Sequence, residues 1–389
     1  YDVLSSEEAR REAEGNPLSF LHVGKPEIDL GPAIDPHDPG VYARGKENLQ
    51  KLIDQKVLVE DPGPALYVYA QTMEGRTQYG IVGCASVEEY LNDTIKKHEL
   101  TRKDKEEDRC NHVRVTNSHS GPIFLTYPDS VAIDAIVANV TSQPPENDHV
   151  ASDGIRHQAW VIKDAGAIRN LQELFGGIRY LYVADGHHRT AAAAIVGRER
   201  KLANPNHRGD EEYNFFLAVC FPASQLKILD YNRVVKDLNG LSMDQFFEKL
   251  KRTFSVMHIQ GRPRLAKKGE FGLYLDGEWY LLSAPDSLLT KSDPVERLDV
   301  TILQQHLLDP ILGIKDPRVD QRIDFVGGIR GLGGLEKRVD SGEMKLAISI
   351  FPTSIHELIA IADAGKIMPP KSTWFEPKLR DGLFVHFLD

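Results

Sequence analysis

The chain has few cysteines and no long apolar run. Cys84, Cys110 and Cys220 are widely separated and odd in number, so they provide neither a disulfide framework nor a zinc signature. We expect small buried thiols in a reducing, cytoplasmic protein. No apolar stretch approaches the roughly 20 residues that a membrane-spanning helix needs, and no signal-peptide pattern is present. Membrane insertion is therefore not expected.

The chain also has fewer basic than acidic residues. The 57 Asp and Glu residues outnumber the 47 Lys and Arg residues, which gives a formal net charge of −10. Such a chain repels a nucleic-acid backbone unless it segregates a basic face. Its hydrophobic and charged fractions are those of an ordinary globular protein. Nucleic acid is therefore not an expected partner, while the oligomeric state stays open, a homodimer included.

The order of predicted elements indicates an α/β (α+β) protein with two lobes. A chain of 389 residues is long for one core. The clearest turn signal between the two parts is Asn239-Gly240, which divides the chain into residues 1–238 and 239–389. Strands alternate with helices in the first part, the apolar strand candidates being 122–127, 155–162, 180–184 and 214–221. We expect a second, C-terminal α/β lobe whose last loop returns to the functional site.

Five consecutive residues, Asp185-Gly186-His187-His188-Arg189, form the strongest functional candidate. They follow an apolar strand and open an Ala-rich helix, a position where ligands bind in open α/β sheets. Glycine permits a tight turn, and helix N-terminal N–H groups, imidazoles and a guanidinium suit phosphate oxygens. We therefore predict phosphate binding by Gly186, His187, His188, Arg189 and Thr190. Asp185 repels an anion unless it holds a metal such as Mg²⁺ or orients a neighbour.

Two further polar clusters have less distinctive patterns. The first cluster consists of residues 96–101 together with the triplet 107–109, and it is strongly charged. Taken alone, it resembles the solvated surface of a helix. The second cluster, residues 154–160, contains Arg156 and His157. His157 is either a ligand-binding residue or an ordinary strand residue.

The C-terminal part contains a proline-rich loop and a glycine-rich stretch. Residues 368–378 include several prolines, and a stiffened loop can present Lys371, Ser372 and Thr373 to a phosphate or nucleotide. Residues 327–334 lack the Gly-Lys-Ser/Thr ending of a P-loop and form no dinucleotide fingerprint, so we predict a plain loop. The chain also lacks His-Glu-x-x-His, kinase-type His-Arg-Asp and Gly-x-Ser-x-Gly elements.

These clusters, in this order, resemble family 1015 of the domains of unknown function. Members carry further residues before the position of Tyr1, so contacts made by a first strand are expected to be missing. Where many members have Pro-Thr-His-Arg, this chain has Asp230-Tyr231-Asn232-Arg233, so no histidine role transfers there. The shared motifs run nearly end to end and are Tyr1-Asp2-Val3, Gln78-Tyr79-Gly80, His98-Glu99-x-Thr101, Glu107-Asp108-Arg109, Gly154-Ile155-Arg156-His157, the Asp185 turn and Met368-Pro369-Pro370-Lys371-Ser372-Thr373.

The Asp-Gly-His-His-Arg turn also resembles the signature of the ParB/sulfiredoxin superfamily, in particular of the free L-serine kinases. This resemblance implies a ParB/sulfiredoxin-like core in which the turn cradles nucleotide phosphate. It also implies that Glu99, in an upstream His-Glu element, is the catalytic base, with His98 beside it. Arg109, Arg156 and His157 are then candidates for substrate binding.

Together these features predict a kinase that uses ATP or ADP with Mg²⁺ and phosphorylates a small hydroxyl substrate, free L-serine first. Glu99, His98 and Asp185 are the predicted catalytic residues. The alternative is a non-catalytic nucleotide-binding switch of the ParB type, which binds nucleotide and forms no phosphorylated product. Sulfiredoxin-like repair ranks lower because no cysteine lies beside the turn, and a two-metal nuclease lacks its carboxylate cluster.

Overall fold

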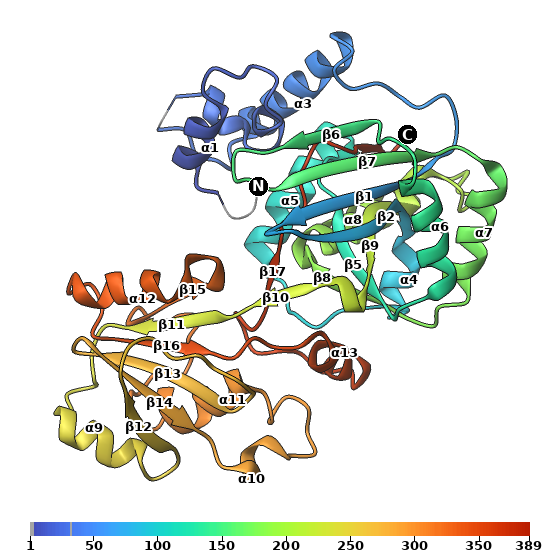
Figure 1. Ribbon diagram of the computed structural model, residues 1–389. Coiled ribbons are helices and arrows are strands. Elements are labelled where there is room, and N and C mark those ends of the chain that lie inside the picture. Colours follow the sequence, from blue (N-terminus) through green and yellow to red (C-terminus); the bar gives the residue numbers. More distant parts are fainter. Residues whose placement is uncertain (1–3, 32) are drawn as a thin grey trace. The chain divides into compact units, whose positions relative to one another are not determined.

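The computed structural model describes residues 4–31 and 33–389. The chain divides into two compact units, of which the first comprises Tyr1–Gln225 with Pro377–Asp389 and the second Leu226–Glu376. Figure 1 traces both units. The motif Tyr1-Asp2-Val3 lies outside the described residues. Within those residues, no helix has the length and apolar character needed to cross a membrane.

An eight-stranded mixed sheet forms the centre of the first unit (Figure 1). Its strands are β1 (Leu66–Met73), β2 (Arg76–Ser86), β3 (Ile95–Lys96), β5 (Ile123–Tyr127), β6 (Asn147–Val150), β7 (Arg156–Ile162), β8 (Leu181–Asp185) and β9 (Phe215–Pro222). Their order is β3-β8-β5-β9-β2-β1-β7-β6. Strands β3 and β8 are parallel, as are β5 and β9, while the other neighbours are antiparallel. A separate short ladder joins β4 (Ser118–His119) to β18 (His386–Phe387).

Several helices of the first unit begin after a residue whose side chain caps them. The helices of this unit are α1 (Ser6–Ala13), α2 (Leu21–Gly24), α3 (Pro39–Asp54), α4 (Val87–Leu91), α5 (Lys103–Thr116), α6 (Val131–Thr141), α7 (Ala165–Gly176) and α8 (His187–Ala203). Ser5 caps α1 and Asp38 caps α3 through side-chain oxygens that accept backbone N–H groups. Helix α8 contacts β5 and β9, and its buried Ala193 and Ala194 pack in the sheet core. Small side chains allow this close packing, as the Ala-rich sequence indicated.

A six-stranded antiparallel sheet organises the second unit. Its strands are β11 (Tyr231–Val235), β12 (Ser255–Ile259), β13 (Glu270–Leu275), β14 (Glu278–Ser283), β15 (Ile323–Gly327) and β16 (Leu346–Ile350), in the order β12-β14-β13-β16-β11-β15. Strand β10 (Lys227–Leu229) pairs separately with β17 (Trp374–Glu376). The helices are α9 (Met243–Leu250), α10 (Asp286–Leu289), α11 (Asp299–Leu303), η4 (Gln304–Leu308), α12 (Gly331–Asp340) and α13 (Ile355–Asp363). The mixed α/β class is therefore confirmed.

The structure corrects two details of the sequence interpretation. The division falls at Gln225/Leu226 rather than after residue 238, because β11 pairs with β15 and β16 of the second sheet. The glycine-rich stretch 327–334 is not a plain loop, since it ends β15, forms the turn η5 (Gly328–Arg330) and begins α12. Leu335 stabilises this helix by burial in the core of the second unit.

The cysteines agree in part with the prediction. All three are free, and Cys110 and Cys220 are buried. Cys84 is exposed instead. Because it lies near the end of β2, the local apolar pattern alone did not distinguish its face.

Candidate functional site

Gly186 joins β8 to α8 and forms the predicted turn. Its φ of 94° and ψ of 28° lie in the left-handed region, which costs a residue with a Cβ about 1–2 kcal/mol. Within the described chain, no side chain caps α8. The first N–H groups of a helix have no partner inside that helix, and they carry the positive end of its dipole. This end of α8 is therefore suited to an anion.

Asp185, which precedes the turn, is paired with a lysine from a distant segment. Lys378 Nζ lies 2.8 Å from Asp185 Oδ2, and the Gly186 N–H group donates to Asp185 Oδ1 at 2.8 Å. Burial acts to raise the pKa of Asp185, but the charges of Lys378 and Arg189 outweigh it and lower that pKa below its usual value. The carboxylate stays ionised, and the lysine offsets the repulsion that it would exert on a phosphate.

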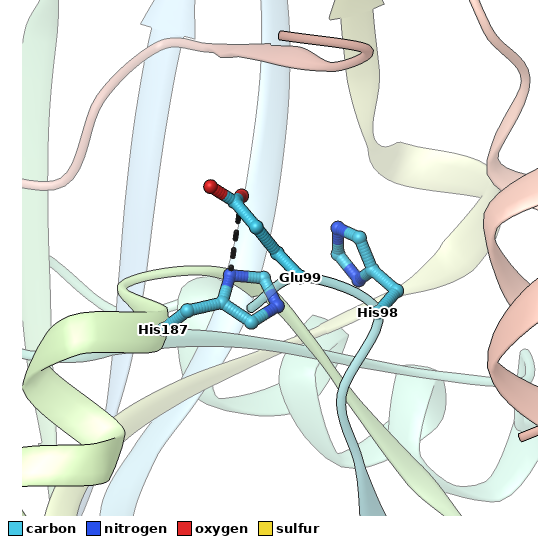
Figure 2. A group of neighbouring side chains, drawn as sticks. All are labelled: His98, Glu99 and His187. Atoms are coloured by element: carbon cyan, nitrogen blue, oxygen red, sulfur yellow. Dashed lines mark ion pairs between the residues drawn. The ribbon is translucent and has the colours of Figure 1, made fainter. Parts of the chain in front are cut away.

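Two histidines and a glutamate meet at the turn (Figure 2). His98 and Glu99 lie in the loop after β3, and His187 begins α8. The rings of His98 and His187 pack edge to face with their centroids 4.4 Å apart. Glu99 Oε2 lies 3.8 Å from His187 Nδ1, and the Glu99 side chain is 48% exposed. The structure thus brings His98 and Glu99 together with the turn.

The imidazoles at this site are neutral near pH 7. Burial lowers the pKa of His187 to about 4, against the opposing effect of Asp185. Burial also lowers the pKa of His98 well below its usual value, with His187 reinforcing and Asp185 and the Val183 backbone opposing the shift. His188 Nε2 accepts a hydrogen bond from the Arg102 N–H group at 3.1 Å, which leaves Nδ1 as the N–H donor of a neutral ring.

Arg189 and Thr190 have different environments in the first turn of α8. Arg189 Nη1 donates to the Pro122 carbonyl at 2.7 Å and lies 3.8 Å from Asp381 Oδ1. A Cβ added to Gly186 would meet this guanidinium at 3.3 Å, so the arginine lies against the turn. Thr190 is fully buried, and its hydroxyl donates to the Gly186 carbonyl at 3.0 Å. That hydroxyl supports the turn from inside the protein.

Arg109 lies near Arg189 at a small cavity. Both arginines line a space of about 30 Å³ together with His112, His119 and Asp381. Such a volume suits a water molecule better than an amino acid. Arg109 itself, on α5, forms an ion pair with Asp108. Arg109 thus shares a small cavity with Arg189, and its contact with a substrate stays a prediction.

The other predicted substrate-binding residues are Arg156 and His157. Both side chains form hydrogen bonds with residues of neighbouring strands. Arg156 forms two hydrogen bonds with Asp148, at 2.8 and 2.6 Å. His157 is fully buried, and its Nδ1 lies 2.7 Å from the Tyr69 hydroxyl. Burial lowers the pKa of His157 to about 4, and the charge of Arg380 adds to the effect. These contacts join neither residue to the turn.

Lys371, Ser372 and Thr373 belong to the second unit. The Lys371 carbonyl accepts from Arg233 Nη2 at 3.0 Å, and its ammonium lies 5.5 Å from the centre of the Tyr231 ring. The Ser372 hydroxyl donates to the Pro369 carbonyl at 2.6 Å. These bonds fix the conformation of the loop, and its contact with a nucleotide stays a prediction.

Sequence reasoning missed the residues that connect the C-terminal segment to the turn. The Lys378 carbonyl accepts a hydrogen bond from Gln71 Nε2 at 2.8 Å, and Gln78 Nε2 donates to Gln71 Oε1 at 3.1 Å. Both glutamines are buried and pair across β1 and β2. The sequence signal for this connection was a pair of glutamines within two mostly apolar strands. Buried amides need specific hydrogen-bond partners, so such glutamines indicate a contact with another segment.

One group of side chains in the described structure could hold a metal ion. His98, Glu99 and His187 each offer a ligand atom, and these atoms all lie within 4.8 Å of one another. Asp185 is a separate oxygen donor at the turn, at present paired with Lys378. The site thus combines a helix end suited to an anion, neutral imidazoles and an accessible carboxylate.

Comparison with known proteins identifies the family. The model of the family described as "Protein of unknown function (DUF1015)" matches residues 1–301. The chain therefore belongs to the DUF1015 family, as its motifs predicted. Among curated protein sequences, none matches this chain.

The chain is distantly similar to several solved structures. A free serine kinase in complex with AMP is 13% identical with a TM-score of 0.38, over 79% of this chain and 91% of that one. SbnI with a C-terminal truncation, from Staphylococcus aureus, is 11% identical with a TM-score of 0.42, over 78% and 87%. A conserved hypothetical protein from Pyrococcus furiosus is 14% identical with a TM-score of 0.36, over 77% and 93%. These likenesses are too distant to transfer residue roles.

Proposed function

We propose that this protein is a nucleotide-dependent kinase of a small hydroxyl compound, with free L-serine as the first candidate. One observation carries the proposal: Glu99, an accessible carboxylate, lies 3.8 Å from His187 at the uncapped N-terminus of α8. Phosphoryl transfer needs phosphate held by positive groups and a base near the attacking hydroxyl. This arrangement supplies both beside one turn.

The turn would hold the phosphates of ATP or ADP. The N–H groups at the start of α8 and the Nδ1–H group of His188 would donate to phosphate oxygens, while Arg189 and Lys378 supply positive charge. Mg²⁺ bound with the nucleotide would neutralise phosphate charge, and Asp185 is the carboxylate at the turn that could contact it. The loop with Lys371, Ser372 and Thr373 is proposed to contact the nucleotide. A ParB/sulfiredoxin-like core, implied by the motif, belongs to the same proposal.

Glu99 would act as the general base. Its carboxylate would accept the hydroxyl proton while the hydroxyl oxygen bonds to the terminal phosphorus, and the bond from that phosphorus to the leaving nucleotide would break. His98 and His187 would hold the Glu99 loop beside the turn. Serine as the acceptor rests on the motif resemblance alone.

The test combines product analysis with nucleotide binding. Wild-type protein is incubated with L-serine and either Mg·ATP or Mg·ADP, and O-phosphoserine is measured by mass spectrometry. Loss of a general base should lower kcat of Glu99→Gln by about 100-fold or more, with little change in nucleotide Kd. Glu89→Gln, at an exposed position of α4, is the matched control and should retain full turnover.

Three results would revise the proposal. No O-phosphoserine with either nucleotide would refute serine as the substrate. Full turnover by Glu99→Gln would refute the role of Glu99 as base. Tight nucleotide binding without any phosphorylated acceptor would instead favour a ParB-type switch.

A further inference from the structure

The group of His98, Glu99 and His187 has properties that phosphate binding does not explain. His98 and His187 are only 2% and 6% exposed. His98 makes no hydrogen bond of normal geometry through either ring nitrogen within the described residues, and neither does Nε2 of His187. Leaving a buried polar atom unpaired costs about 1–3 kcal/mol. Buried His112, by contrast, has a partner, since its Nε2 lies 3.1 Å from the Val23 carbonyl.

The three side chains converge on a common space. Figure 2 shows Glu99 above His187, with the His98 ring turned toward the same region. One ligand atom from each residue lies within 4.8 Å of the other two. Ligands at about 2.0–2.2 Å from a tetrahedral metal ion lie closer together than this, so binding requires a small inward movement. Glu99 can provide it, because its side chain is half exposed and lies in a loop.

We propose that His98, Glu99 and His187 form a binding site for a divalent transition-metal ion, with Zn²⁺ as the representative ion. Two imidazole nitrogens and one carboxylate oxygen are a common protein ligand set for zinc and for non-haem iron. Mg²⁺ and Ca²⁺ prefer oxygen ligands, so this site differs in selectivity from the Mg²⁺ that accompanies a nucleotide.

Metal binding at this group would inhibit the kinase. A Glu99 carboxylate bonded to Zn²⁺ cannot accept the proton of the substrate hydroxyl, and the ion would occupy space beside the phosphate turn. This consequence rests on the proposed function, whereas metal binding itself does not. The site would therefore make phosphoryl transfer sensitive to transition metals.

The binding test uses metal-free, full-length protein without nucleotide. Zn²⁺ is titrated in competition with a chromophoric chelator, and Co²⁺ is added separately to record its visible absorption. Removing one of three protein ligands should weaken the Zn²⁺ affinity of Glu99→Gln and His98→Gln by about tenfold or more. His258→Gln is the control, because this histidine is 54% exposed and pairs with Glu278 in the second unit.

The outcomes separate this site from the proposed function. Unchanged Zn²⁺ affinity in Glu99→Gln, whose side chain is exposed enough for the fold to tolerate the change, would overturn the metal site. Absence of Zn²⁺ binding by wild-type protein would also overturn it, even if O-phosphoserine forms. A metal site lost in Glu99→Gln but retained in His258→Gln would support it, even if no kinase activity exists. In an active preparation, Zn²⁺ should inhibit turnover, and a zinc-selective chelator should restore it.

Discussion

Replacing Gly186 by alanine tests most specifically whether the turn from Asp185 to Arg189 binds phosphate. The left-handed backbone at φ 94° costs alanine about 1–2 kcal/mol, which corresponds to a fall in Tm of roughly 2–8 °C for a unit of this size. The new Cβ would also lie 3.3 Å from the Arg189 guanidinium. Because the methyl group occupies the surface that a phosphate must approach, we expect ADP affinity to fall by about tenfold, or 1.4 kcal/mol.

A matched glycine separates backbone strain from loss of the site. Gly209 has a φ of 100°, and a Cβ added there meets nothing within 4 Å. Gly209→Ala should therefore lose a similar amount of stability and keep its affinity for ADP. Calorimetric titration and thermal melts of both variants provide the comparison. If Gly186→Ala binds ADP as tightly as Gly209→Ala does, the turn does not hold phosphate.

Three other predictions concern charge and pH. Lys378→Met should weaken ADP binding measurably in titrations and cost roughly 1 kcal/mol of stability, because Asp185 loses its partner and both side chains are about a third exposed. His157 has a pKa of about 4 in the folded protein, so as pH falls its imidazole is protonated in the unfolded chain before it is protonated in the folded protein. The free energy of unfolding should therefore fall by up to about 3 kcal/mol between pH 6.5 and pH 4. Thermal melts of His157→Asn over this pH range should show a smaller loss of stability. Burial raises the pKa of Asp299 to about 7, so stability should fall as pH rises from 4 to 7, and Asp299→Asn should remove that slope in denaturant titrations.

The turn from Asp185 to Arg189 was predictable as a structural element because its signals are local. An apolar strand, a glycine and an Ala-rich helix stand next to each other in the sequence, and each imposes a short-range conformational preference. The side-chain caps Ser5 and Asp38, at the starts of α1 and α3, are local signals of the same kind. The place of Glu99 beside His187 came from the motif resemblance, since the charges around it are typical of a solvated surface.

Other features depend on long-range packing that no local pattern encodes. Lys378 neutralises Asp185 across a separation of 193 residues, and no spacing rule connects the two. His157 fits a strand pattern and a ligand pattern equally well, and its contact with Tyr69 depends on the pairing of β7 with β1. The glycine-rich stretch became part of α12 because burial of Leu335 outweighs the weak helix propensity of glycine.

A crystal structure of the protein with Mg·ADP tests the central claim most directly. We predict phosphate oxygens at hydrogen-bonding distance, about 2.7–3.2 Å, from the N–H groups of His187 and His188, with Glu99 facing the terminal phosphorus. Nucleotide phosphates bound elsewhere, with the turn from Asp185 to Arg189 left without a ligand, would contradict it.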